Sequence, residues 1–404
     1  MGRIFEKNLI WLPTLLILYN FCANLSNDIY LPSMPKLVQL FNSTPATLQL
    51  TMTAWFAGVA LPQLFFGPLT DKVGRRPVIL GGGIIFIVAT LACIATNNMA
   101  IFIIARFFQG VGVCSLNVTT FSILIDLYQY KARIQVMNRI NMFGTMAPLI
   151  GPVIGGYVLT YFSWQANFYI IFAMGLISVI GLWIKLPESN LQLNPQALNV
   201  KHVMHNYLML TKNKNLIRHL IPYCLILGGL VAYLTTAPFI IIKQLNISPS
   251  NFGYTQLPVF GMYILGAMLF NRIDNDVFAQ KVTQIGFKVV LLSCLLMLCL
   301  SYFFGNNLYV FIIPMVLYAL GFSFCSAPFV NEVMASAPLI KGSAAAFLGC
   351  GMALSCMLCS FVVGMIYNGS IFSIAIVLSS VLILASIFYF LPAFYTHHLT
   401  NETN

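Results

Sequence analysis

Long apolar runs separated by short polar turns make up most of this chain. Runs of at least about 17 residues, long enough to cross a bilayer core as a helix, occur twelve times. We expect spans near residues 10–31, 46–68, 77–96, 99–124, 137–161, 165–186, 217–242, 252–271, 284–304, 307–330, 342–366 and 371–392. The pattern therefore predicts an all-α membrane protein with twelve transmembrane helices.

One long hydrophilic stretch interrupts this pattern, at residues 187–216. It divides the chain into two pseudo-symmetric six-helix bundles, residues 1–186 and residues 217–404 with a short tail. Two such halves are typical of a secondary transporter whose site lies between them. No Walker A loop is present, so the sequence does not favour nucleotide-driven transport.

Composition agrees with a membrane protein. The chain is 59% hydrophobic and 7% charged, whereas soluble domains have about 25% charged residues. The ten cysteines all lie in apolar runs without a CxxC pair, so we interpret them as helix-packing residues and expect no metal site. We also expect no cofactor and no enzymatic activity, because no nucleophile–base pair or phosphate loop is present.

The basic residues predict the orientation. If the N-terminus is cytoplasmic, seventeen Lys and Arg fall in cytoplasmic segments and two, Lys36 and Lys243, fall outside. This bias obeys the positive-inside rule and places both termini and the connector in the cytoplasm. The net charge of +11 is thus a topology signal, and we expect lipid rather than nucleic acid as a partner.

The first apolar run carries a polar stripe. Asn20, Asn24 and Asp28 recur every four residues and share one helix face, with Asn27 beside them. Asp28 is the one acidic side chain inside an apolar run, and membranes retain such a group where it faces water, a partner helix or cargo. We predict that Asp28 carries a proton and that Asp28 and the three asparagines line the substrate site. An interfacial acid near the helix end before Pro32 is the alternative.

The fourth run contains an arginine at mid-bilayer depth, Arg106, followed by Gln109. An arginine there costs several kcal/mol unless it is paired or hydrated, so it should face the protein interior. Two interpretations remain open. Arg106 is either a structural residue bonded to backbone carbonyls and amide side chains, or a neighbour that tunes the acidity of Asp28. We include Gln109 among the substrate-site residues.

Two further segments are candidates for conformational gating. In the turn after the second run, Gly67 would permit close helix contact and Gly74 a tight turn, while Asp71 could form a charge cluster with Lys72, Arg75 and Arg76. In the fifth run a small-residue face would let another helix approach closely, with a kink at each proline. Its candidate residues are Gly144, Pro148, Gly151, Pro152, Gly155 and Gly156, and we expect 144, 148, 152 and 156 to share one face.

These motifs resemble the major facilitator superfamily. The segment Gly67 to Pro77 matches its second-helix loop G-x-L-[ST]-D-x-x-G-R-[RK], Arg106 to Gly110 its fourth-helix motif, and Gly144 to Gly156 its antiporter motif. Over nearly the whole chain the sequence is similar to 12-helix drug/proton antiporters of the Bcr/CflA type, most closely the MdfA-like multidrug antiporters. The resemblance implies alternating access and proton-coupled efflux of small lipophilic compounds, including antibiotics, across the bacterial inner membrane by a monomer.

One position departs from the resemblance. Those relatives carry two acids on the first helix, eight residues apart; here the second is Asp28 and the first is replaced by Asn20. We therefore expect a single proton per cycle and a reduced preference for cations. Export of an endogenous metabolite, such as a siderophore or amino-acid derivative, is an alternative, and a proton-coupled importer is a less favoured one.

Overall fold

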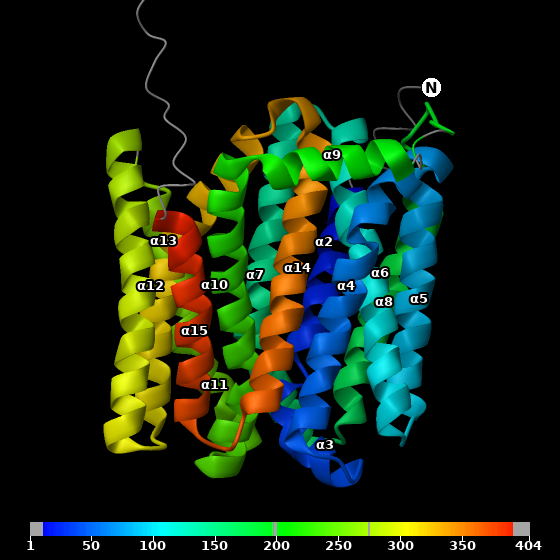
Figure 1. The fold of residues 1–404 in the computed structure, drawn as a ribbon. Coiled ribbons are helices and arrows are strands. Elements are labelled where there is room, and N and C mark those ends of the chain that lie inside the picture. Colours follow the sequence, from blue (N-terminus) through cyan, green and yellow to red (C-terminus); the bar gives the residue numbers. More distant parts are fainter. Residues whose placement is uncertain (1–10, 196, 198–199, 274, 391–404) are drawn as a thin grey trace, which may run out of the picture.

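A computed structural model describes residues 11–195, 197, 200–273 and 275–390 of the chain. Its regular structure over these residues is entirely helical (Figure 1), which confirms the predicted all-α class.

The helices before the connector are α2 (Trp11–Asp28), η1 (Leu31–Ser33), α3 (Met34–Leu40), α4 (Pro45–Val73), α5 (Arg75–Ala95), α6 (Met99–Leu127), α7 (Tyr130–Tyr161) and α8 (Gln165–Lys185). Those from the connector onward are α9 (Val200–Lys212), α10 (Lys214–Pro238), η2 (Phe239–Gln244), α11 (Pro249–Phe270), α12 (Asp276–Phe304), α13 (Leu308–Ala335), η3 (Pro338–Ile340), α14 (Lys341–Ile366) and α15 (Ile371–Phe390). We call α2 to α8 the N-half and α10 to α15 the C-half.

The polar turns between the apolar runs supply the helix caps. A capping side chain accepts a hydrogen bond from a free backbone N–H group in the first helical turn. Six long helices begin in this way, at Thr44, Asn98, Asn213, Ser248, Asn275 and Asn307. The residues that break the hydrophobic pattern therefore also fix where these helices start.

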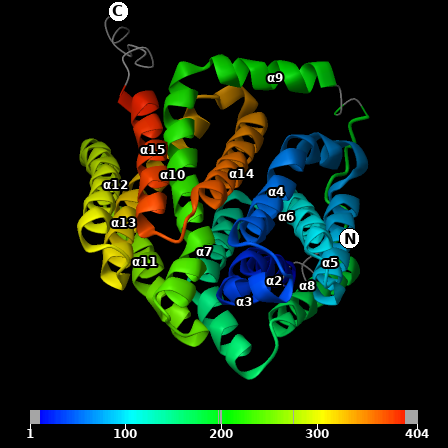
Figure 2. The same cartoon turned by 60° about the horizontal axis from the view of Figure 1, so that its bottom comes forward.

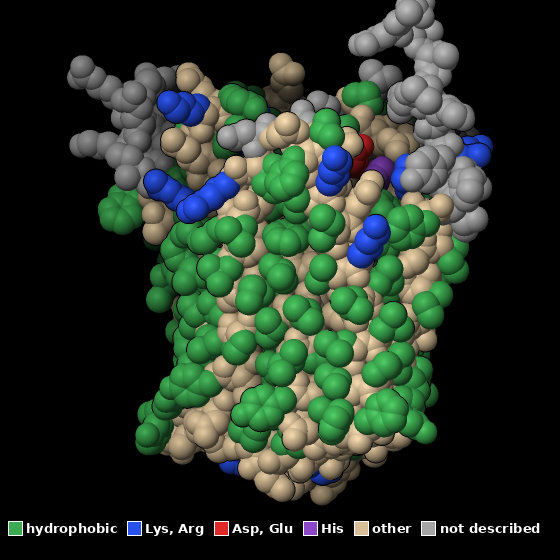
Figure 3. All heavy atoms as spheres, turned by 90° about the vertical axis from the view of Figure 1, so that its left-hand side faces the viewer, with side chains coloured by type: hydrophobic (Ala, Val, Ile, Leu, Met, Phe, Trp, Pro, Cys, Tyr) green, Lys and Arg blue, Asp and Glu red, His purple; other side chains and the backbone are tan. Residues whose placement is uncertain are grey.

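Eleven of the described helices, α4 to α8 and α10 to α15, are long and apolar enough to cross a membrane. The exception among the predicted spans is α2, because its three asparagines and Asp28 lower its hydropathy. It still packs against α7 and α8 inside the N-half (Figures 1 and 2), so we count it as the twelfth spanning helix. Hydrophobic side chains cover most of the face shown in Figure 3, and its Lys and Arg side chains lie mainly at one edge.

The first span is longer than predicted. After Asp28 the chain does not leave the protein; it passes through η1 and α3 to Leu40 in a broken helical path. Every residue from Leu25 to Met34 is buried. Pro32 and Pro35 interrupt the helix because proline cannot donate the backbone hydrogen bond that an α-helix interior needs. Asp28 therefore lies near the middle of this path rather than at its end.

The connector contains a helix that the hydropathy pattern did not predict. This helix, α9, runs across the top of the molecule in Figure 1 and contacts α10 and α14. Because of its polar residues, this segment was predicted as a hydrophilic connector. In the structure, its Tyr207 and Leu210 side chains are buried against the bundle. We call the side of the molecule that bears α9 the connector side.

The two halves meet along two helix pairs, α4 with α14 and α7 with α11. On the side away from α9, η1 also contacts α10 and α11, and α3 contacts η2. There Gly156 of α7 lies so close to the Pro249 carbonyl that an added methyl group would overlap it. The halves are thus closed against each other on the side opposite the connector.

Candidate proton and substrate site

Asp28 is the last residue of α2 and is buried, with 5% of its surface exposed. Its side chain faces α7, where a methyl group placed on Gly151 would lie 3.0 Å from the Asp28 Cβ atom. One turn further along α7, Gly155 packs directly against the Ile29 carbonyl. Glycine at both positions lets the two backbones approach, and this contact encloses the carboxylate.

Arg106 of α6 is completely buried beside the end of α2. Its Nη1 donates to the Ser26 carbonyl oxygen at 3.0 Å and to Gln109 Oε1 at 2.6 Å. Its Nη2 donates to Asn27 Oδ1 at 3.5 Å. The guanidinium group also lies over the Tyr30 ring, 4.6 Å from the ring centre, in a cation–π arrangement. These contacts tie α6 to the polar end of α2.

Arg106 and Asp28 do not form an ion pair. The ion pairs seen between described residues, with nitrogen–oxygen distances of 4.0 Å or less, are those of Arg75 with Asp71 and with Asp126. The hydrogen-bond partner of the Asp28 carboxylate is the neighbouring Asn27 amide, at 3.3 Å. Asn27 therefore stands between the cation and the acid, since it contacts both.

Asn20 and Asn24 form a second polar group, about one to two turns along α2 from Asp28. Asn24 Nδ2 donates to the Asn20 carbonyl and to Asn20 Oδ1, at 2.8 and 3.1 Å. Asn20 Nδ2 donates to Asn117 Oδ1 of α6 at 3.4 Å. The predicted stripe is therefore divided into an Asn20–Asn24 pair and an Asn27–Asp28 pair, each bonded to α6.

Several contributors were not found from the sequence. Tyr30 bonds Thr51 of α4 at 2.9 Å, and Gln109 Nε2 donates to Thr90 of α5 at 2.7 Å. With Asn117, these residues join α4, α5 and α6 around α2. Polar side chains of this kind also serve as ordinary hydrogen-bond partners between spanning helices, so only their position beside Arg106 and Asn20 distinguishes them.

The turn after α4 holds only part of the predicted charge cluster, because Arg76 Nη2 donates to the Trp183 carbonyl at 2.8 Å and not to Asp71. Two acids that the sequence did not assign to this cluster join it. Arg75 pairs with Asp71 and with Asp126 of α6. Glu188, just after α8, accepts from the backbone N–H groups of Arg75 and Arg76, at 2.9 and 3.1 Å. Asp126 and Glu188 lie far from this turn in sequence, so only the fold brings them here. The cluster ties α4, α5, α6 and the end of α8 together on the connector side.

The glycines of this turn behave differently from each other. Gly74 has a φ angle of 102°, as the predicted tight turn requires. Gly67 was expected to permit close helix contact, and this is wrong for the present conformation, because a methyl group there would meet no atom within 4 Å. Gly67 instead lines a cavity between α4, α6, α9 and α14.

The small-residue positions of α7 do not all share one face. Gly144 faces Asn20 and Asn24 of α2, whereas Gly156 faces Pro249 of α11. The physical reason is that four residues turn an α-helix by about 40° more than one full turn, so positions 144 and 156 differ by about 120°. The prediction of a single face for 144, 148, 152 and 156 is wrong. Pro148 and Pro152 lie inside α7, which continues unbroken from Tyr130 to Tyr161.

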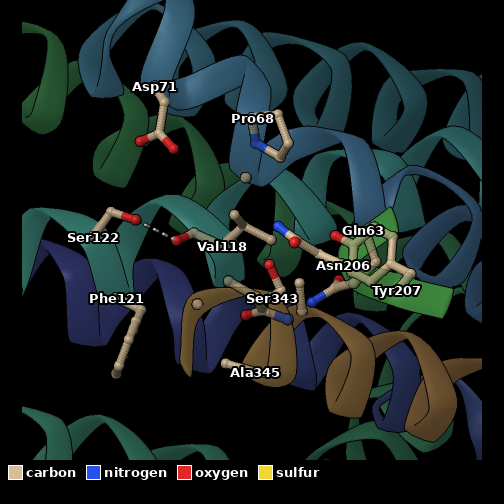
Figure 4. A pocket seen from close by; sticks show the side chains of 14 residues that line it. Gln63, Pro68, Asp71, Val118, Phe121, Ser122, Asn206, Tyr207, Ser343 and Ala345 are labelled. Carbon is tan, nitrogen blue, oxygen red and sulfur yellow. Dashed lines mark hydrogen bonds between the residues drawn. The ribbon is translucent and has the colours of Figure 1, made fainter. Parts of the chain in front are cut away.

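The cavity on the connector side has a volume of about 400 Å³ and is lined by fourteen residues (Figure 4). Among them is Tyr207 of α9, whose hydroxyl donates to the Leu64 carbonyl of α4 at 3.2 Å. Its ring stacks on Phe347 of α14, with 6.2 Å between ring centres. Burial raises the pKa of Tyr207 to about 12, so its hydroxyl stays a hydrogen-bond donor at neutral pH.

Comparison with known proteins places this arrangement among transporters. The profile of the family described as Major Facilitator Superfamily matches residues 16–357. The multidrug transporter MdfA of Edwardsiella piscicida is 27% identical over 348 residues, which are 86% of this chain and 84% of that protein. MdfA of Yersinia pestis bv. Antiqua (strain Angola) is 28% identical over 83% of this chain and 82% of that one.

Solved structures agree on the fold. The partially occluded inward open conformation of the xylose transporter XylE from E. coli superposes with a TM-score of 0.72 at 14% identity, covering 96% of this chain and 98% of that one. The human organic anion transporter MFSD10 gives a TM-score of 0.68 at 18% identity, covering 94% and 98%. At these identities the likeness extends to the fold alone.

Proposed function

The chain belongs to the major facilitator superfamily and is a membrane transporter rather than an enzyme, and from this premise we propose that it exports small lipophilic compounds in exchange for protons. The similarity to multidrug transporters named MdfA supports export of drugs. We further propose that Asp28 carries the proton. The observation behind this role is a buried carboxylate with an amide neighbour and no cation at ion-pair distance within the described residues.

The burial of Asp28 makes its charge state matter. A carboxylate away from water is costly as an anion unless a cation or several donors compensate it, and a proton removes that cost. Asp28 receives one amide hydrogen bond from Asn27. Binding of a proton, or of a cargo molecule with donor groups, would therefore change the stability of the α2–α7 contact around it.

Arg106 serves a different purpose in this proposal. Its guanidinium is held by the Ser26 carbonyl and by Gln109, so it positions the end of α2. It also bonds Asn27, the same residue that donates to Asp28. Arg106 would thus influence Asp28 through the orientation of Asn27 and not as a direct counter-ion.

The proposed cycle follows alternating access. With the side opposite the connector closed, as in this structure, deprotonated Asp28 permits a compound from the connector side to occupy the space beside Asn20, Asn24 and Asn27. When the opposite side opens, the compound leaves and Asp28 takes up a proton. The neutral acid costs less to enclose, so the protein can close and return.

We also propose an orientation in the membrane, a set of moving segments and a monomeric state. The excess of Lys and Arg at one edge supports assigning the connector side to the cytoplasm of a bacterial inner membrane. The charge cluster around Arg75 and the α7 glycines would move as the halves rock. A single chain holds all of the residues named here, so a monomer suffices.

Proton release on compound binding tests this function. Purified protein in weakly buffered detergent solution is mixed with N-phenyl-1-naphthylamine, a neutral aromatic amine, or with tetraphenylphosphonium, a lipophilic cation. We expect wild type to release about one proton per bound molecule and Asp28→Asn to release none, since the amide holds no exchangeable acid proton.

Glu332→Gln provides the matched control, because Glu332 is an exposed acid at the end of α13 and should not affect release. Cells that express Asp28→Asn should also lose proton-driven extrusion of both compounds. Unchanged proton release together with unchanged extrusion in Asp28→Asn would overturn the role of Asp28.

A further inference from the structure

The cavity under α9 is lined by three spanning helices and by the connector helix. Its walls come from α4, α6 and α14, and the connector helix α9 adds Asn206 and Tyr207. In Figure 4, Gln63, Asn206 and Tyr207 lie at one end, while Asp71, Ser122 and Phe121 lie at the other. Both halves and the connector therefore contribute to one cavity, which is partly open to the outside.

The lining suits an uncharged ligand with hydrogen-bonding groups. Gln63, Asn117 and Asn206 supply amides that can both donate and accept, and Ser343 supplies a hydroxyl. Asp71 is the one charged residue of the lining, and its carboxylate already pairs with Arg75. Phe121, Val118 and Pro68 provide apolar surface between these groups. A lipophilic cation would find no free acid here, whereas a neutral aromatic molecule would find both surfaces that it needs.

The α9 wall is attached in a way that can be released. Tyr207 is fastened by one hydrogen bond to the α4 backbone and one ring stack on α14. These partners belong to opposite halves, so the wall spans the interface that rearranges when the halves rock. The adjacent Asn206 is half-buried and points into the cavity in Figure 4.

The cavity also leads toward α2. Asn117 lines it and accepts a hydrogen bond from Asn20, the first residue of the polar stripe. A molecule that exchanges hydrogen bonds with Asn117 would therefore compete directly with the Asn20–Asn117 contact. This shared residue gives a polar route from the connector side to the stripe.

We propose that this cavity is a loading subsite for neutral aromatic compounds with hydrogen-bonding groups, and that Asn206 and Tyr207 of α9 form its wall. The proposal rests on the export function above and adds a substrate class and a binding position to it. The connector helix is then part of the binding apparatus rather than a passive linker.

Equilibrium binding of N-phenyl-1-naphthylamine to the purified full chain, followed by fluorescence, tests the subsite. We expect Tyr207→Ala to weaken binding about fivefold, the effect of one lost aromatic contact. Asn206→Ala should weaken it about threefold, the effect of one lost hydrogen bond. Met209→Ala, exposed on the same helix, should bind as wild type, and tetraphenylphosphonium binding should stay within about twofold for all three variants because the subsite offers cations little.

The outcomes separate this proposal from the proton mechanism. Unchanged binding in both Tyr207→Ala and Asn206→Ala would overturn the subsite, and so would an effect confined to Tyr207→Ala, which would indicate lost helix packing. Asp28→Asn should lose proton release, whereas Tyr207→Ala and Asn206→Ala should still release about one proton per bound molecule because they leave Asp28 in place. If Asp28→Asn keeps its proton release while the α9 variants bind weakly, the subsite stands and the proton role of Asp28 fails.

Discussion

α2 and α10 are the first helices of the two halves. Both are followed by a different type of helix near a proline, but their polar side chains differ. α2 ends at Asp28 and the chain continues into the short helix η1 around Pro32; α10 ends at Pro238 and continues directly as η2, a π-helix. Proline removes a backbone donor in both cases, which favours a change of helix type. The stripe of α2 contains three asparagines and a carboxylate, whereas α10 has no charged residue between His219 and Pro238.

The polar groups of the two helices are also satisfied differently. In α10, Thr235 and Thr236 donate to carbonyls of their own helix, and Tyr233 donates to Gln256 of α11 within the same half. In α2, Asn20 and the Ser26 carbonyl bond residues of α6. The hydroxyls of α10 need no partner that changes charge, but the α2 contacts surround a group that can. Under the proposed function, the coupling chemistry lies in the N-half, whereas these contacts of α10 involve uncharged groups.

Among the tests of the difference between α2 and α10, loss of the Arg106 guanidinium should have the largest effect. Arg106→Leu leaves the Ser26 carbonyl and the Asn27 and Gln109 oxygens without their donor in a buried site. Each hydrogen bond to a charged group contributes about 1.5 to 3 kcal/mol, so we expect unfolding to become easier by on the order of 3 kcal/mol. The measurement is thermal unfolding of purified protein, together with proton release. Arg139→Ala, at an exposed arginine of α7, is the control and should unfold as wild type; equal stability of Arg106→Leu would refute the positioning role.

Apolar runs and the polar turns between them were sufficient to predict the spanning helices, because membrane helices satisfy their own backbone and must be apolar along their length. The same reasoning misjudged the first span, since a helix with a buried polar stripe can continue past a proline when the protein encloses it. It also missed α9, whose polar surface hides two buried side chains, Tyr207 and Leu210.

The site was predictable as a set of residues but not as a set of contacts. Helical periodicity placed Asn20, Asn24 and Asp28 on one stripe, and the cost of a buried cation pointed Arg106 inward. The sequence could not reveal that Asn27 lies between Arg106 and Asp28, or that Asn117 reaches Asn20. Those facts depend on how α2 and α6 are rotated against each other, which pairwise packing decides.

An acid at position 20 should add a second negative charge to the polar stripe of α2 and so increase its difference from α10. Asn20→Glu places a carboxylate beside Asn24 and Asn117, at the half-buried end of the stripe. A close charge pair contributes about 1.5 kcal/mol at the low end, so tetraphenylphosphonium should bind roughly tenfold more tightly. Equilibrium binding of this cation to purified protein is the measurement.

Asn20→Gln keeps the amide and should show no gain for the cation. N-phenyl-1-naphthylamine should respond much less than the cation to either substitution, because it carries no charge. A gain for the neutral amine equal to that for the cation would mean that position 20 changes the shape of the site and not its charge.

The smallest effect is expected in α10. Tyr233→Phe removes the hydroxyl that donates to Gln256 at 2.9 Å but keeps the ring that packs on Phe311. A neutral hydrogen bond contributes about 1 kcal/mol, and Gln256 keeps its bond to Thr255, so thermal stability should fall only slightly. Proton release on compound binding should be unchanged, because no residue of this contact carries a charge. If Tyr233→Phe abolished proton release as Asp28→Asn does, coupling would not be confined to the N-half and the contrast between α2 and α10 would fail.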